Sequence, residues 1–249
     1  MTNQVYCGPH LDDVAQGSHI ELTGEEARHA HVKRTDIGEL IDVVNGRGLR
    51  ATIEVTSVTS SSLTGTAVEV VEEAPSLYPM TLVQALAKGG RDESAVEAAI
   101  EVGVQGIVPW QADRSIVKWA GPKAAKGVTK WEQVALAAMK QSRQAYLPTV
   151  SDVHTTKQLA QAIRSVVGGG GRVFICHEEA TQRLAGIELT EPGPVWIVVG
   201  PEGGMAPAEV DLLVEAGGEL VLLGDTVLRS GTAGSVAATV VQVTSGAWR

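Results

Sequence analysis

The stretch that decides the fold is WIVVGPEGGMAPAEVDLL, residues 196–213. It opens with a short apolar run typical of a buried strand, continues through a turn with three glycines and Pro201, and ends in a helix-like pattern. Glycines in such a turn let a ligand approach the backbone closely. The stretch therefore predicts one strand–loop–helix step of an α/β fold, with a ligand-binding loop at the carboxyl end of the strand.

The same alternation extends over residues 80–249. Short apolar runs alternate there with helix-like patterns, which indicates an α/β domain with a parallel sheet. The expected strands are 80–87, 106–110, 172–176, 194–199 and 219–224, and the expected helices are 91–104, 123–144, 158–167, 206–216 and 231–244.

Residues 1–74 have a different pattern and predict a separate β-rich domain. Thr23 and Glu26 match a capping box, which predicts a helix that begins after Thr23. Segments rich in Val, Ile and Thr follow, and residues 45–48 read as a hairpin turn between the first two. A small β-barrel or sandwich is expected, and residues 72–79 are the expected linker. The expected strands are 39–45, 49–58 and 62–71.

Composition limits the class of protein. The net charge of −9 disfavours a polyanionic partner for the chain as a whole. Residues 114–143 differ, with seven Lys or Arg and one Glu, which allows nucleic-acid binding, although a solvated helix face is the simpler interpretation of charge alone.

Cys7 and Cys176 give neither a disulfide framework nor a metal cluster. Without an apolar run near the ~18 residues of a membrane helix, or a signal-peptide pattern, we expect a cytoplasmic protein with no membrane partner.

The turn 200–204 reads GPEGG and matches neither GxGxxG nor GxxxxGK[ST]. No lysine follows it, and Glu202 would repel a pyrophosphate at close range. The Glu202 carboxylate is better tolerated beside a cationic or hydroxyl-rich ligand, and S-adenosylmethionine meets that description. The alternative is a structural turn in which Glu202 favours the N-terminus of the next helix.

Arg229 is the second unusual residue. It lies in the loop 224–232, GDTVLRSGT, which follows one expected strand and leads into the last expected helix. A cation at a helix N-terminus opposes the macrodipole by about 0.3–1 kcal/mol. At a ligand-bearing sheet edge, this placement predicts an anion or a developing negative charge nearby. The alternative is a salt bridge from Arg229 to Asp225 or Glu202.

These loops, in this order, resemble the SPOUT class of methyltransferases, and more narrowly the family that methylates N3 of a uridine in 16S ribosomal RNA. The resemblance implies an α/β fold with a C-terminal trefoil-knotted parallel sheet and a small N-terminal PUA-like β-barrel domain. It implies S-adenosylmethionine as methyl donor, 16S ribosomal RNA in the 30S subunit as substrate, and a homodimer whose partner completes each site. The matching stretches are residues 27–46, 98–117, 130–150, 196–213 and 222–238.

The resemblance also implies roles for individual residues. Arg229 would be catalytic and would stabilise negative charge on O2 and O4 of the base. The general base is unassigned, and Glu202, water or an RNA phosphate could serve. The implied cofactor contacts are Val199, Gly200, Pro201, Glu202, Gly203, Gly204, Leu222, Leu223, Gly224, Val227, Leu228 and Thr232. The implied RNA contacts are Arg28, Arg34, Lys88, Arg91, Arg114 and Arg143.

One motif departs from the family pattern. The last motif commonly reads LRTETA, whereas this chain has LRSGTA, with Ser230 and Gly231 in place of a threonine and a glutamate. No role is assigned to a glutamate at this position.

Two other functions stay open: a different SPOUT reaction, on the ribose 2′-O or on guanosine N1, and a non-catalytic RNA-binding or ribosome-assembly protein. The six histidines lack zinc-like spacing, so no metal is expected.

Overall fold

The structure is a computed structural model that describes residues 3–8 and 10–248. The chain divides into two compact units, Met1–Pro75 with Met139–Leu147, and Ser76–Ala138 with Pro148–Arg249. The sequence predicted residues 80–249 as one continuous domain, but residues 139–147 belong to the first unit. Within the described ranges, no helix combines the length and the apolar character needed to cross a membrane.

The first unit is built on a five-stranded sheet with the order β1-β3-β4-β5-β2. The β1–β3 pair is parallel and the other pairs are antiparallel. The expected strands and hairpin turn are confirmed, whereas β1 and β2 were not predicted. β1 has only three residues, and β2 was missed although its buried Ile20 and Leu22 alternate with exposed neighbours. The elements are β1 (Val5–Cys7), β2 (His19–Thr23), α1 (Gly24–Lys33), β3 (Leu40–Val44), β4 (Leu49–Val58) and β5 (Ser62–Glu72).

The capping box predicted at Thr23 is wrong. Thr23 occupies the N-cap of α1, but its side chain makes no cap hydrogen bond. The Glu26 carboxylate instead accepts a hydrogen bond from Lys140 Nζ at 2.7 Å, and both side chains are only 16% exposed. A carboxylate–ammonium bond joins two opposite charges, whereas a bond to a backbone N–H has one charged partner, so the ion pair with Lys140 takes Glu26 away from the cap.

The segment 139–147 is fixed to the first unit by its backbone and by Tyr146. The Tyr146 hydroxyl donates to Glu73 O at 2.7 Å, and Arg50 Nη2 donates to Arg143 O at 2.8 Å. Gly48 has φ +104 and lies so close to the Tyr146 ring that no Cβ would fit. The glycine of the β3–β4 turn is therefore needed for this contact.

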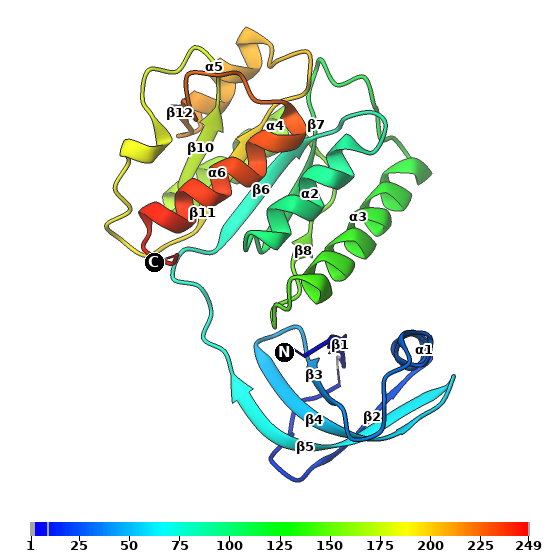
Figure 1. Cartoon of the computed structure of the whole chain (residues 1–249). Helices are drawn as coiled ribbons and strands as arrows, with labels where there is room; N and C mark the ends of the chain where they lie inside the picture. Colours follow the sequence, from blue (N-terminus) through cyan, green and yellow to red (C-terminus); the bar gives the residue numbers. More distant parts are fainter. Residues whose placement is uncertain (1–2, 9, 249) are drawn as a thin grey trace. The chain divides into compact units, whose positions relative to one another are not determined.

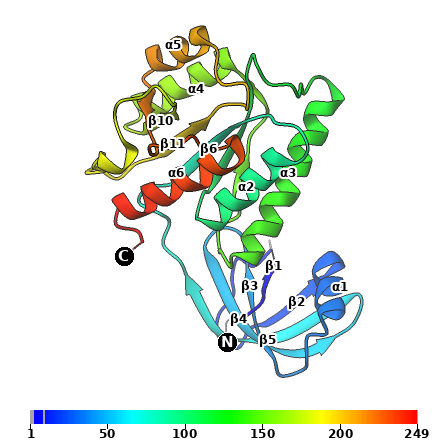
Figure 2. The ribbon, with the colours of Figure 1, turned by 45° about the horizontal axis from the view of Figure 1, so that its top comes forward.

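The second unit is a sheet of parallel strands with the order β12-β10-β11-β6-β7-β8, and β9 also pairs with β7. Helices α2, α3 and α6 cover one face, and α4 and α5 cover the other (Figures 1 and 2). The strands are β6 (Met80–Ala85), β7 (Gly106–Gln111), β8 (Thr149–Val150), β9 (His154–Thr155), β10 (Arg172–Cys176), β11 (Val195–Val199) and β12 (Glu219–Val221). The helices are α2 (Arg91–Glu101), α3 (Pro122–Gln141), α4 (Thr156–Gly168), the 3-10 turn η1 (Leu184–Gly186), α5 (Pro207–Glu215) and α6 (Ser230–Thr244).

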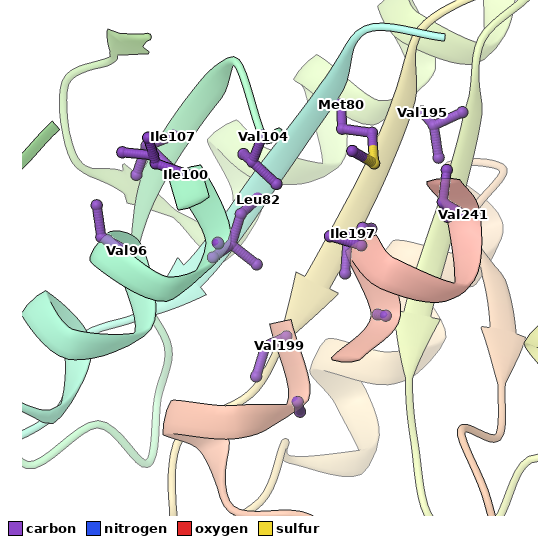
Figure 3. Close-up of a cluster of buried hydrophobic side chains, with 14 of the residues drawn as sticks. Met80, Leu82, Val96, Ile100, Val104, Ile107, Val195, Ile197, Val199 and Val241 are labelled. Carbon is purple, nitrogen blue, oxygen red and sulfur yellow. The ribbon is translucent and has the colours of Figure 1, made fainter. Parts of the chain in front are cut away.

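Successive side chains of each central strand enter opposite core layers. Leu82 of β6 and Ile197 of β11 pack with helices α2 and α6. Figure 3 shows side chains of β6, β11, α2 and α6 together in this layer. Their neighbours Val83 and Val198 pack with α4 and α5. Burial on both faces explains why the strands read as continuous apolar runs in the sequence. The expected strands and helices of this unit are confirmed, with shifted ends.

Backbone hydrogen bonds hold the chain after β12 against the connection between β10 and β11. Leu222 N–H donates to Gln182 O at 2.8 Å, and Leu222 O accepts from Leu184 N–H at 3.0 Å. Leu184 is buried in the same core cluster as Ala233 and Ala237 of α6. The end of the chain is thus packed against both the sheet and the connection between β10 and β11, the crossing expected of a trefoil-knotted sheet. These bonds also end β12 at Val221, earlier than predicted.

Candidate functional site

A pocket of about 670 Å³ lies at the carboxyl edge of the parallel sheet. The loops after β10, β11 and β12 build it, together with the start of α2 and the first turn of α6. Because β10 lies between β11 and β12, three adjacent strand ends meet there. The lining residues are Arg91, Cys176, His177, Glu178, Val199, Gly200, Pro201, Glu202, Gly204, Met205, Val221, Leu222, Leu223, Gly224, Asp225, Thr226, Val227, Leu228, Arg229, Ser230, Gly231 and Ala233.

Glycines shape two sides of this pocket. Gly204 has φ +71, and its N–H donates to Pro201 O at 2.9 Å, which closes the turn after β11. A Cβ at Gly200 would lie 2.9 Å from Met205 Cγ, so this position has no room for a side chain. At Gly224, no described atom lies within 4 Å of an added Cβ. A side chain at Gly224 would therefore occupy open space at the pocket.

Charged groups in the lining are partly paired. Among the described residues, three carboxylates and two arginines line the pocket. Glu202 Oε1 accepts from Arg91 Nη1 at 3.1 Å. Asp225 forms an ion pair with Arg183, which lies outside the lining. This pairing leaves one carboxylate and one arginine of the pocket without a counter-ion among the residues that the structure describes.

Arg229 is the unpaired arginine. It occupies the N-cap of α6, where its backbone O accepts bonds from the N–H groups of Thr232 and Ala233. Its exposed side chain makes no ion pair or hydrogen bond with any residue that the structure describes. The salt bridges considered from the sequence, to Asp225 or Glu202, are not formed. The cation that opposes the α6 macrodipole therefore lines the pocket free of an internal partner.

The sequence analysis missed the third loop, which follows β10. Cys176, His177 and Glu178 line the pocket from this strand end. Burial raises the pKa of the Cys176 thiol to about 12, so this thiol stays neutral near neutral pH. The Glu179 N–H donates to His177 Nδ1 at 3.2 Å, which places the proton of the neutral ring on Nε2. The loop has no glycine to mark it, although the sequence did predict the strand before it, residues 172–176.

The predicted cofactor contacts mostly gather at the pocket. Gly203 and Thr232 do not line it, and Gly203 O instead accepts from Arg114 Nη1 at 3.2 Å. Their assignment as cofactor contacts stays a prediction, as do the others. The predicted cofactor contacts that line the pocket are Val199, Gly200, Pro201, Glu202, Gly204, Leu222, Leu223, Gly224, Val227 and Leu228.

The predicted RNA contacts are all exposed and divide between the two units. Arg34, after α1, and Arg143, after α3, both have a left-handed backbone, with φ of 58° and 60°. Such a conformation costs a non-glycine residue about 1–3 kcal/mol and is often found at functional sites. Arg28, Arg34 and Arg143 belong to the first unit, and Lys88, Arg91 and Arg114 belong to the second.

The departure at Gly231 has a structural counterpart. A Cβ at Gly231 would lie 3.4 Å from Arg91 O, an ordinary contact, so the position could carry a side chain. In this chain, the acidic partner of Arg91 comes from the β11 loop, as Glu202. In the part of the chain that the structure describes, no group of three or more His, Cys, Asp or Glu side chains could hold a metal ion.

Comparison with known proteins assigns the chain to a family. A family model of an RNA methyltransferase domain matches residues 73–242, and one of an RNA methyltransferase PUA domain matches residues 22–68. The ribosomal RNA small subunit methyltransferase E of Mycobacterium bovis is 38% identical over 233 residues, which cover 93% of this chain and 89% of the relative. The chain belongs to the small subunit methyltransferase E family. The Bacillus subtilis member is 31% identical and covers 86% of either chain.

Solved structures agree with this family. The Neisseria gonorrhoeae member, bound to S-adenosyl methionine, matches with a TM-score of 0.86 at 25% identity, over 97% of this chain and 98% of that one. A methyltransferase of Legionella pneumophila in complex with the same cofactor has a TM-score of 0.84 at 26% identity, over 98% of each chain. The predicted fold class, a SPOUT α/β sheet with an N-terminal PUA-like β-domain, is confirmed.

Proposed function

We propose that this chain transfers a methyl group from S-adenosylmethionine to N3 of a uridine in 16S ribosomal RNA. The observation that carries the proposal is Arg229, a cation without a counter-ion among the described residues, in a pocket built by the loops after β10, β11 and β12. The family relatives named as ribosomal RNA small subunit methyltransferases support the substrate class.

The pocket fits this cofactor on three counts. Its volume of about 670 Å³ lies within the ~300–1,000 Å³ of typical small-molecule sites. Gly204 and Gly224 leave backbone and open space exposed to a ligand. The described lining carries three carboxylates and no lysine, which suits a cationic ligand and disfavours a polyphosphate.

S-adenosylmethionine supplies an electrophilic methyl carbon on a positively charged sulfur. As N3 of the uracil bonds to that carbon, the carbon–sulfur bond would break, its electron pair would go to sulfur, and S-adenosylhomocysteine would leave. The N3–H proton passes to solvent, and the negative charge that develops on deprotonation spreads to O2 and O4. Arg229 stabilises this charge, and one well-placed donor of this kind contributes about 2.7–4 kcal/mol. Glu202 is already paired with Arg91, so it is better suited to hold that arginine than to accept the proton.

RNA binding by the first unit belongs to the same proposal. Arg28, Arg34 and Arg143 are exposed there, and phosphate contacts from such residues give affinity without reading sequence. The net charge of −9 gives little non-specific attraction, so recognition relies on folded RNA shape in the 30S subunit. A homodimer and a cytoplasmic location complete the proposal, and sedimentation equilibrium of the purified chain tests the dimer.

The proposed activity is tested with labelled S-adenosylmethionine and purified 30S subunits that lack the modification. We expect label in 16S RNA, with faster transfer to subunits than to naked RNA. Absence of transfer, with S-adenosylmethionine still bound in calorimetry, would favour a non-catalytic RNA-binding protein. The other SPOUT reactions would place the label on a ribose or on a guanosine.

A further inference from the structure

The acidic residue left unpaired in the pocket is Glu178. It follows His177 after the end of β10 and is exposed to solvent. Glu202 is neutralised by Arg91 and Asp225 by Arg183, but Glu178 has no ion pair with any described residue. Its place in the loop is fixed by the backbone, since His177 N–H donates to Val221 O at 3.0 Å.

Water solvates the exposed Glu178 carboxylate until a ligand enters the pocket and displaces part of that water. Coulomb attraction rises as water is displaced, so a cationic ligand gains most from the one carboxylate that no arginine already neutralises. The cofactor of the proposed function carries two positive groups, the sulfonium and the ammonium of its methionine part. Its carboxylate would, in turn, repel Glu178.

We propose that Glu178 is the counter-ion of the cationic methionine part of S-adenosylmethionine and selects this ligand by charge. The inference rests on the proposed function. Among the pocket carboxylates, Glu178 attracts the cationic ligand, because the charge of Glu202 is already paired with Arg91 and that of Asp225 with Arg183. Glu178 acts on cofactor affinity and leaves the stabilisation of the base to Arg229.

Three ligands that share an adenosine part test this charge selection. Methylthioadenosine carries neither cation, S-adenosylhomocysteine carries only the ammonium, and S-adenosylmethionine carries both. The variant E178Q keeps the size of the side chain and removes its charge. The matched control is E179Q, because Glu179 is the exposed neighbour that does not line the pocket. Calorimetry measures the dissociation constants, and a thermal melt verifies folding.

We expect E178Q to weaken S-adenosylmethionine about tenfold, the effect of losing one charge-assisted contact. Methylthioadenosine should bind equally to E178Q and the unmodified chain, and E179Q should bind every ligand normally. A parallel loss for S-adenosylhomocysteine would identify the ammonium as the partner, and an unchanged value would identify the sulfonium.

The inference is overturned if E178Q binds S-adenosylmethionine normally or loses methylthioadenosine to the same degree. An equal loss in E179Q would also overturn it, because the effect would then come from general charge. If the unmodified chain fails to bind S-adenosylmethionine, the proposed function fails and takes the inference with it. If E178Q and the unmodified chain both bind S-adenosylmethionine normally, only the role of Glu178 is removed.

Discussion

Replacing Arg229 with serine should separate activity from stability. Arg229 has the extended backbone of an N-cap, with φ −66° and ψ 149°, but provides no cap bond. A serine there would add a cap bond of ~1 kcal/mol. It would also remove the charge that opposes the helix dipole, a gain of about 0.3–1 kcal/mol. We therefore expect Arg229→Ser to raise the free energy of unfolding of the second unit by about 1–2 kcal/mol.

Turnover should change in the opposite direction. Loss of the donor for the charge on O2 and O4 should lower kcat about 10²–10³-fold. Cofactor affinity should change far less, because Arg229 acts on the base. Methyl transfer to 30S subunits measures kcat, calorimetry measures affinity, and a thermal melt measures stability, with about 2–4 °C of Tm per kcal/mol. Arg164→Ser, at an exposed arginine of α4, is the matched control.

Two results would refute this reasoning. An Arg229→Ser variant with normal kcat would show that the arginine has no catalytic role. A variant that is less stable than the unmodified chain would show that Arg229 has a structural partner.

Three further changes test other parts of the site. Gly224→Val should leave Tm unchanged, because an added Cβ meets no described atom within 4 Å. Its side chain would occupy the pocket, so S-adenosylmethionine binding should weaken at least ~10-fold; full affinity in calorimetry would contradict the placement of the cofactor beside Gly224. Glu209→Ala should cost about 2–4 kcal/mol in urea unfolding, since this buried carboxylate accepts bonds from Asp113 N–H, Thr156 Oγ1 and Ala206 N–H; a loss below ~1 kcal/mol would contradict that role. Burial raises the pKa of the Cys176 thiol, so in a Cys7→Ser background a thiol reagent should label it more slowly at pH 8 in folded protein than in urea-unfolded protein. Equal labelling rates in the two states would argue against a raised pKa.

Local features of the site could be predicted from the sequence. The turn 200–204 and the loop that contains Arg229 were found because glycines, proline and a misplaced cation are visible within a few residues. Strands β6, β7, β10, β11 and β12 were found because they read as continuous apolar runs. The two-residue strands β8 and β9 were not predicted.

Features that depend on distant partners were missed. The sequence does not show that β10 lies between β11 and β12, so the contribution of Glu178 could not be predicted. Glu26 read as part of a capping box because its partner Lys140 is far away in the chain. The packing of residues 139–147 in the first unit was missed for the same reason, since the contacts of Tyr146 lie on a remote hairpin.

The central claim is that the methyl group goes to the base and, within it, to N3 of uracil. Its most direct test is digestion of 16S RNA from treated 30S subunits, followed by mass spectrometry of the nucleosides and mapping of the modified position. The account predicts 3-methyluridine at one nucleotide, and an initial rate of its formation about 10²–10³-fold lower with Arg229→Ser. A 2′-O-methylated nucleoside or 1-methylguanosine as the product would contradict it.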